Sequence, residues 1–167
     1  MRKLYLLLLL AVMPLLANAQ NIKFGYFSYN EILQSMPDKA IVEKNLSDLR
    51  GKYEAEIKRV ESEFNAKYEQ FLEGQRDFAP SILQKRQAEL QEIMKKNIAF
   101  KAEAERLLKQ AEKDAYAPLR QKILAAVQRI GKERQLAFVI NTDGDACPYT
   151  DPGAGEDVNL LIKDAVK

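Results

Sequence analysis

Histidine and tryptophan are absent from the 167-residue chain, and cysteine occurs once, at Cys147. Without histidine there can be no histidine-based catalytic triad, no histidine general base and no histidine metal site. A single thiol can form neither an intrachain disulfide nor a thiolate zinc cluster. The phosphate-binding patterns G-x-x-x-x-G-K-[ST] and G-x-G-x-x-G are also missing. These absences favour a binding or scaffold protein over an enzyme, and no cofactor is expected.

The first 19 residues have the organisation of a secretory signal peptide. Arg2 and Lys3 precede an apolar run of 13 residues, shorter than the roughly 20 needed to span a bilayer, and Ala17-Asn18-Ala19 forms a cleavage site. Cleavage after Ala19 would leave 24 basic and 24 acidic residues, compared with 26 and 24 in the whole chain. An exported chain with no net charge is not expected to bind nucleic acid.

Two short elements are expected ahead of the long helices. Residues 22–27 alternate in part between apolar and other side chains, which predicts a strand. Ser28 and Glu31 have the spacing of a capping box, so a short helix should start here. It should end near Met36, because Pro37 disfavours helical geometry in the residue before it.

The middle of the chain carries the pattern of a long α-hairpin arm. From Asp38, which can act as an N-cap, apolar residues recur with a mean step of about 3.6, which predicts a nearly straight helix with one narrow stripe. The stripe consists of Val42, Leu46, Leu49, Tyr53, Ile57, Val60, Phe64, Tyr68 and Phe71. Residues 74–81 should form a turn, and a second helix with a matching stripe should run to about Arg134. The arm, residues 38–118, is predicted to end where Pro118 bends this helix.

The remaining residues, 20–37 and 119–167, should form a small β-rich body. Residues 136–140 indicate a strong strand, residues 146–149 a weak edge strand, and residues 156–166 a terminal helix. About 65 residues without a disulfide are too few for a sizeable core, so the body is expected to be the core of an oligomer. This oligomer core is predicted to contain Ile22, Phe24, Tyr26, Leu136, Phe138 and Ile140.

The order and spacing of segments at both ends of the chain resemble the Skp/OmpH family of periplasmic chaperones. The segments that carry this resemblance are Ile22–Phe27, Ile32, Leu33, Pro37, Ile123–Ile130, Leu136–Ile140, Tyr149–Pro152, Asp157 and Val158. The resemblance implies an α+β, mostly helical fold, with a long antiparallel α-hairpin arm on a small β-rich oligomerisation body. It also implies a homotrimer whose arms surround a cavity. The implied function is that of an ATP-independent periplasmic holdase for unfolded outer-membrane β-barrel proteins.

Six aromatic residues of the arm are candidates for contact with such clients. They are Tyr53, Phe64, Tyr68, Phe71, Phe78 and Phe100. For those on the stripe, packing between the two arm helices is the preferred interpretation. Phe78 lies in the turn and fits the stripe worst, which makes it the best candidate for an exposed apolar contact. Charged residues such as Glu54, Lys58 and Glu61 are interpreted as a solvated helix face.

The main alternative function is that of a structural or adaptor protein, which docks to another envelope component through the tip of its arm. Client contacts spread along the arm would favour the chaperone. Contacts confined to residues 74–81 would favour the adaptor. The residues leave open whether a membrane or lipopolysaccharide is a further partner.

Two smaller features each have a structural and a functional interpretation. The acidic turn at residues 141–145 resembles the start of a calcium loop, but Ala146 and Pro152 stand where such a loop needs Gly and Glu. A solvated turn is therefore preferred. Cys147 is interpreted as an unreactive, partly buried thiol, and a disulfide between subunits is the alternative in an oxidising compartment.

Overall fold

The computed structural model describes residues 22–167, so the predicted signal peptide lies outside the described residues. The elements in chain order are β1 (Phe24–Phe27), α2 (Tyr29–Ser35), α3 (Pro37–Gly74), α4 (Pro80–Glu133), β2 (Phe138–Asn141), β3 (Gly155–Asp157) and α5 (Asn159–Val166). They divide into two compact units. The hairpin unit is Met36–Gln121, and the sheet unit comprises the residues up to Ser35 and Lys122–Lys167. Between residues 22 and 167, no helix is both long and apolar enough to cross a bilayer.

The sheet unit is built on three parallel strands in the order β2-β1-β3. In the central strand, Phe24 lies beside Phe138 of β2 on one side and beside Gly155 of β3 on the other. Parallel neighbours require long connections, and the segments that join these strands are long enough to provide them. The strands therefore bring together the two ends of the described chain.

The third strand differs from the predicted one. Residues 146–149 form no strand, and β3 uses residues that the sequence pattern assigns to the terminal helix. That helix, α5, begins at Asn159 instead. Gly155 allows the pairing with β1, because a Cβ atom at this position would lie 2.5 Å from the ring of Phe24. Backbone pairing with a distant strand thus outweighs the local helical pattern.

The core of the sheet unit lies on the sheet face that carries Gly25 and Phe27. Its buried side chains are Phe27, Ile32, Ile123, Ala126, Ile130, Val158, Ile162 and Val166. Phe24 and Tyr26 alternate with these positions, face the other way and are only half-buried. The core of a single chain is therefore on the opposite face from these two aromatic residues.

The first turn of α2 is held by side chains from outside the helix. Ser28 Oγ accepts a hydrogen bond from Glu31 N (3.1 Å), as the capping box predicts, whereas the carboxylate of Glu31 pairs with Lys163 (2.7 Å). Asp143 accepts hydrogen bonds from Ser28 Oγ (2.6 Å) and from Asn30 N (2.7 Å). The prediction of a merely solvated acidic turn is thus wrong at Asp143, which acts as a second cap for α2.

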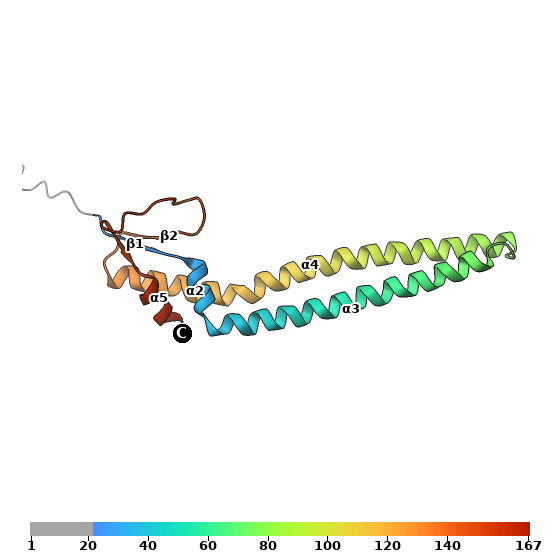
Figure 1. Ribbon diagram of the computed structural model, residues 1–167, viewed down its shortest axis with the longest axis horizontal. Coiled ribbons are helices and arrows are strands. Elements are labelled where there is room, and N and C mark those ends of the chain that lie inside the picture. The colour runs from blue at the N-terminus through green and yellow to red at the C-terminus, as the bar shows by residue number, and fades with distance from the viewer. Residues whose placement is uncertain (1–21) are drawn as a thin grey trace, which may run out of the picture. The chain divides into compact units, whose positions relative to one another are not determined.

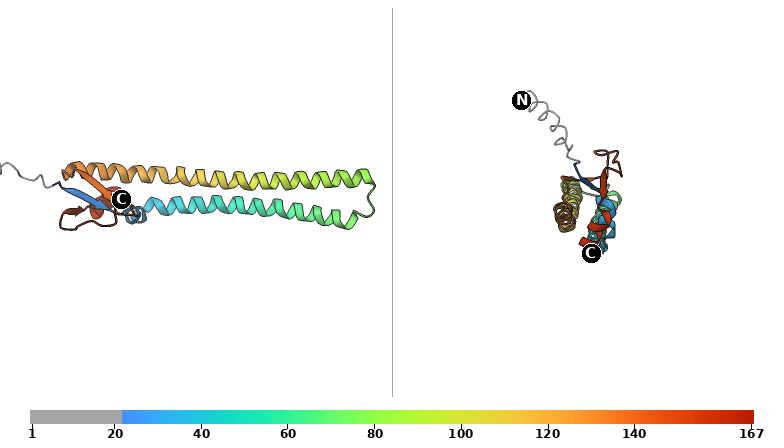
Figure 2. Two further views of the ribbon diagram at one scale, coloured as in Figure 1. Left: turned by 90° about the horizontal axis from the view of Figure 1, so that it is seen from above. Right: turned by 90° about the vertical axis from the view of Figure 1, so that its left-hand side faces the viewer.

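The hairpin unit consists of two long helices joined by a short turn. α3 has 38 residues, or roughly 57 Å at 1.5 Å per residue, and α4 lies antiparallel beside it (Figure 1 and Figure 2). The prediction that Asp38 is the N-cap is wrong, because α3 starts at Pro37 and its N-cap is Met36. Proline suits this place, since its missing N–H would have had no partner there. α4 runs through Pro118 as one helix.

The apolar stripes of α3 and α4 meet in a narrow seam, as predicted. No side chain of α3 is fully buried, and its stripe is half-buried apart from Tyr68, which is exposed. Asn97 of α4 donates from Nδ2 to the carbonyl oxygen of Val60 in α3 (3.1 Å). Lys101 pairs with Glu61 across the seam at 3.0 Å. Because the seam is a single row of contacts, each turn of α3 is supported in this unit mainly by the helix that faces it.

Candidate functional site

One side of the hairpin carries a row of exposed apolar residues. We call it the apolar flank and define it by Phe64, Tyr68, Leu72, Met94 and Ile98. Tyr68, Leu72, Met94 and Ile98 are 44–62% exposed. The rings of Phe64 and Tyr68 stack with centroids 6.1 Å apart. Phe64, Met94 and Ile98 line an open groove of about 350 Å³ together with polar residues, among them the ion pair of Lys101 and Glu61, so apolar side chains from both helices meet there.

The opposite side of the seam is covered by ion pairs, and we call it the charged flank. Its residues are Glu56, Arg59, Glu63, Arg86, Glu89, Glu92, Lys96, Glu103 and Arg106. The hydrogen bond from Arg59 lowers the pKa of the Glu56 carboxyl, and Lys96 does the same for Glu92. All these groups are exposed to solvent, so each pair adds little stability. The contrast between the two flanks is what marks the apolar one as a candidate binding surface.

The six aromatic candidates do not share one surface. Tyr53 and Phe100 face each other across the seam, with ring centroids 6.4 Å apart. Phe71 and Phe78 are also 6.4 Å apart, and both are half-buried. The expectation that Phe78 is the best candidate for an exposed apolar contact is therefore wrong, because Phe78 is half-buried beside Phe71. Tyr68, which is 45% exposed, takes that place.

Sequence reasoning missed three residues of the apolar flank, namely Leu72, Met94 and Ile98. A signal for them was present, because residues four apart on a helix lie one above the other. The rows 64-68-72 and 94-98 have this spacing and lie next to the stripe. A stripe with a second apolar row beside it is wider than a seam between two helices requires.

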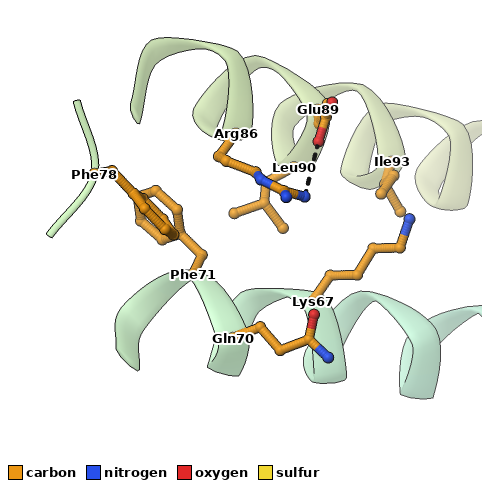
Figure 3. A pocket seen from close by; sticks show the side chains of 8 residues that line it. All are labelled: Lys67, Gln70, Phe71, Phe78, Arg86, Glu89, Leu90 and Ile93. Carbon is orange, nitrogen blue, oxygen red and sulfur yellow. Dashed lines mark ion pairs between the residues drawn. The ribbon is translucent and has the colours of Figure 1, made fainter. Parts of the chain in front are cut away.

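A second, smaller groove lies near the turn of the hairpin, and we call it the tip groove. Its volume is about 160 Å³. It is lined by Lys67, Gln70, Phe71, Phe78, Arg86, Glu89, Leu90 and Ile93 (Figure 3). Phe78 packs over Gly74, where a Cβ atom would lie 2.6 Å from Cζ of that ring. Glycine at position 74 thus allows the turn to fold back and form one wall of the groove.

The sheet unit also has an uncovered apolar surface, which we call the open sheet face. Phe24 and Phe138 stack there with ring centroids 5.6 Å apart and planes 12° apart. Phe138 is 48% exposed and Ile22 is 60% exposed, while Tyr26 and Ile140 are half-buried. These are five of the six residues predicted for an oligomer core. Leu136, the sixth, packs against Gly25 on the other face.

Cys147 lies in the loop between β2 and β3. Its side chain is half-buried, as predicted, and its Sγ lies 3.5 Å from the carbonyl oxygen of Tyr149. No other cysteine is present in the chain, so within one subunit the thiol has no disulfide partner.

Both units of the chain match one protein family. A family model described as outer membrane protein (OmpH-like) matches residues 23–163. The chain belongs to the OmpH-like family. The solved structure of a candidate outer membrane chaperone (OmpH-like) from Caulobacter crescentus CB15 is similar, with a TM-score of 0.68 and 14% sequence identity. The alignment covers 86% of this chain and 82% of that chain, and at this identity it shows the OmpH-like fold alone. No curated protein matches the chain.

Proposed function

We propose that this OmpH-like protein is a periplasmic chaperone that holds unfolded outer-membrane proteins without ATP. The observation that carries the proposal is the apolar flank, which gathers four of the six large apolar side chains that the hairpin exposes; the other two are Ile41 and Ile82. Contiguous exposed apolar surface of this kind marks a site of interaction. Membership of the OmpH-like family supports a role with outer-membrane proteins, and the similar fold of a candidate outer membrane chaperone supports the holding function.

The physical basis for holding is shallow apolar contact. An unfolded β-barrel protein exposes alternating apolar side chains that aggregate unless they are covered. Complete burial of one large apolar side chain is worth about 1.5–3 kcal/mol, and a shallow flank provides only part of this for each contact. Many weak contacts can retain a client and still release it by equilibrium, so no nucleotide cycle is required.

We further propose that the chain works as a homotrimer, assembled through the open sheet face. Phe24, Tyr26 and Phe138 form an aromatic surface that a lone chain would leave in contact with water. Covering it with the same surface of other subunits would supply the core that the small sheet unit lacks. Three hairpins in one assembly could then surround a client on several sides.

The test is the aggregation of an unfolded outer-membrane β-barrel protein, measured by light scattering with no nucleotide present. Replacing Tyr68, Leu72, Met94 and Ile98 together by Ser should abolish protection. The matched control replaces Glu56, Arg59, Glu92 and Lys96 by Ser, which removes three ion pairs at constant net charge and should keep protection. Single alanine changes at Phe64 or Phe100 should weaken protection only mildly.

A shortened hairpin tests reach together with surface chemistry, because the deleted segments include Phe64, Tyr68 and Met94 of the apolar flank. The contact between Asn97 and Val60 sets the register, so Glu61–Phe71 faces Arg86–Lys96. Deleting both segments removes eleven residues, or three turns, from each helix and keeps the seam in phase. The shortened chain should retain its oligomeric state and lose protection. Full protection by this variant, or a requirement for ATP, would contradict the chaperone and favour the adaptor that docks through its tip.

A further inference from the structure

The tip groove lies on the charged side of the seam and combines an apolar floor with a cationic rim. Phe71, Phe78, Leu90 and Ile93 form the floor, and all four are half-buried. Lys67 and Arg86 extend into the space between the two helices (Figure 3). The groove is thus separate from the apolar flank, whose exposed residues lie on the other side of the seam.

The two cations of the rim are incompletely neutralised. Arg86 has a single acidic neighbour, Glu89, at 3.6 Å, which is too long for a strong hydrogen bond. Lys67 has no acidic partner within 4.0 Å among residues 22–167. The other ion pairs of the charged flank are closer than this one. The rim therefore has one positive charge in excess, beside an apolar floor.

The size of the groove limits what can enter it. Its volume is about 160 Å³, and a cavity of roughly 150 Å³ holds a benzene ring. One aromatic or leucine side chain would fill it, whereas a long acyl chain would not fit. A single excess positive charge suits one carboxylate and offers little attraction to a polyphosphate or a nucleic acid.

We infer that the tip groove binds one apolar side chain of an unfolded polypeptide, together with the carboxylate of an adjacent Asp or Glu. The side chain would lie on Phe71 and Phe78, and the carboxylate would pair with Lys67 and Arg86. This inference rests on the proposed function, because it takes unfolded polypeptides as the ligands. It adds that, among unfolded polypeptides, those with an acidic residue next to an apolar one should bind more tightly. The apolar flank cannot provide this preference.

The experiment measures binding of short fluorescent peptides directly, by anisotropy. Three peptides differ only in the residue beside a single Phe, which is Asp, Asn or Lys. The Asp peptide should bind about two- to fivefold more tightly than the Asn peptide, the range expected for an exposed ion pair, and the Lys peptide most weakly. The preference for Asp should weaken at 1 M salt.

Variants of the rim and of the floor of the tip groove should change peptide binding in different ways. Lys67→Gln should remove the preference for Asp, and Lys85→Gln, a nearby exposed cation outside the groove, should leave it unchanged. Phe78→Ala should weaken binding of all three peptides. Gly74→Ala should do the same without altering any charge, because the new Cβ displaces the Phe78 ring. Circular dichroism would check that each variant keeps its helical content.

Three outcomes would overturn the inference. The first is equal binding of the Asp and Asn peptides to the wild-type chain, and the second is an Asp preference that survives Lys67→Gln. The third is tighter binding to vesicles of anionic phospholipid, with displacement of the Asp peptide, which would assign the groove to a membrane. If the wild-type chain still suppresses aggregation in these cases, only the tip groove is misassigned and the proposed function stands.

Discussion

Asp143 stabilises the first turn of α2 from a loop that lies 115 residues away from Ser28 in the sequence. Helix N-termini have backbone N–H groups without partners inside the helix, and a carboxylate satisfies them better than a neutral oxygen. Asn141 contributes in the same way, because its Oδ1 accepts a hydrogen bond from Tyr29 N (3.1 Å). At the scale of single residues, these bonds tie the end of β1 to the end of β2.

Replacing Asp143 by Ala should lower the free energy of unfolding of the protein by about 1–3 kcal/mol, because two donors lose their acceptor. The matched control is Asp145→Ala in the same loop, since Asp145 is exposed and makes no hydrogen bond or ion pair in the described part of the chain. It should change stability by less than about 0.5 kcal/mol. Urea denaturation followed by circular dichroism measures both, and equal effects would show that the cap contributes nothing.

At the scale of elements, the hairpin depends on a seam one side chain wide, to which exposed ion pairs add small contributions. Five of these pairs lie on the charged flank within single helices, at spacings of three or four residues. In three of them the carboxyl has a lowered pKa, because an Arg or Lys side chain donates a hydrogen bond to it: Glu56, Glu92 and Glu103. Such a carboxyl favours the folded state only while it is ionised.

The hairpin should therefore become less stable in acid. A carboxyl whose folded-state pKa lies below its ordinary value of 4.5 stabilises the fold fully above that value, and the contribution is lost as the pH falls from 4.5 through the lower folded-state pKa. The helical circular dichroism signal should melt at a slightly lower temperature at pH 3.5 than at pH 6. Glu56→Gln should reduce this difference, and the control Glu105→Gln, which removes a carboxyl without an ion pair, should not. The same pH dependence in both variants would contradict this explanation.

The two long helices and their seam follow from the sequence, because periodicity is a local property that one segment carries by itself. Their ends follow almost as well, since Gly74 and Pro80 stand at the turn. The third strand does not follow, because residues 155–157 become a strand only through pairing with β1, more than 100 residues away. Met94 and Ile98 have a signal in the sequence, the four-residue spacing beside the stripe, but the pattern does not give how much of each side chain the contact between helices covers.

At the scale of the whole molecule, the open sheet face is an apolar surface that a single chain leaves exposed to water. The ring of Phe138, which stacks on the half-buried Phe24, is 48% exposed, and Ile22 is 60% exposed. The opposite face holds the buried core. A sheet with one face covered by its own helices and one aromatic face free suits self-association.

Phe138→Asp should dissociate the oligomer, because assembly would bury a carboxylate among aromatic rings. Sedimentation velocity at micromolar concentration would measure the loss as a shift to a slower species. The matched control is Leu160→Asp on α5, which also replaces an exposed apolar residue of the sheet unit but lies off the open sheet face. It should leave the mass unchanged. A wild-type chain that sediments as a well-folded monomer would contradict assembly through this face.

The parallel arrangement of the three strands also sets the order in which parts of the protein can fold. β1 emerges more than 100 residues ahead of both of its partners, so the sheet cannot start until β2 has emerged and cannot finish until β3 has. The hairpin can form in the interval, and by bringing Glu43 and Tyr116 to one groove it shortens the loop that the strands must close. Until then, an unpaired aromatic strand is exposed on every nascent chain, which is when the protein is itself most vulnerable to aggregation.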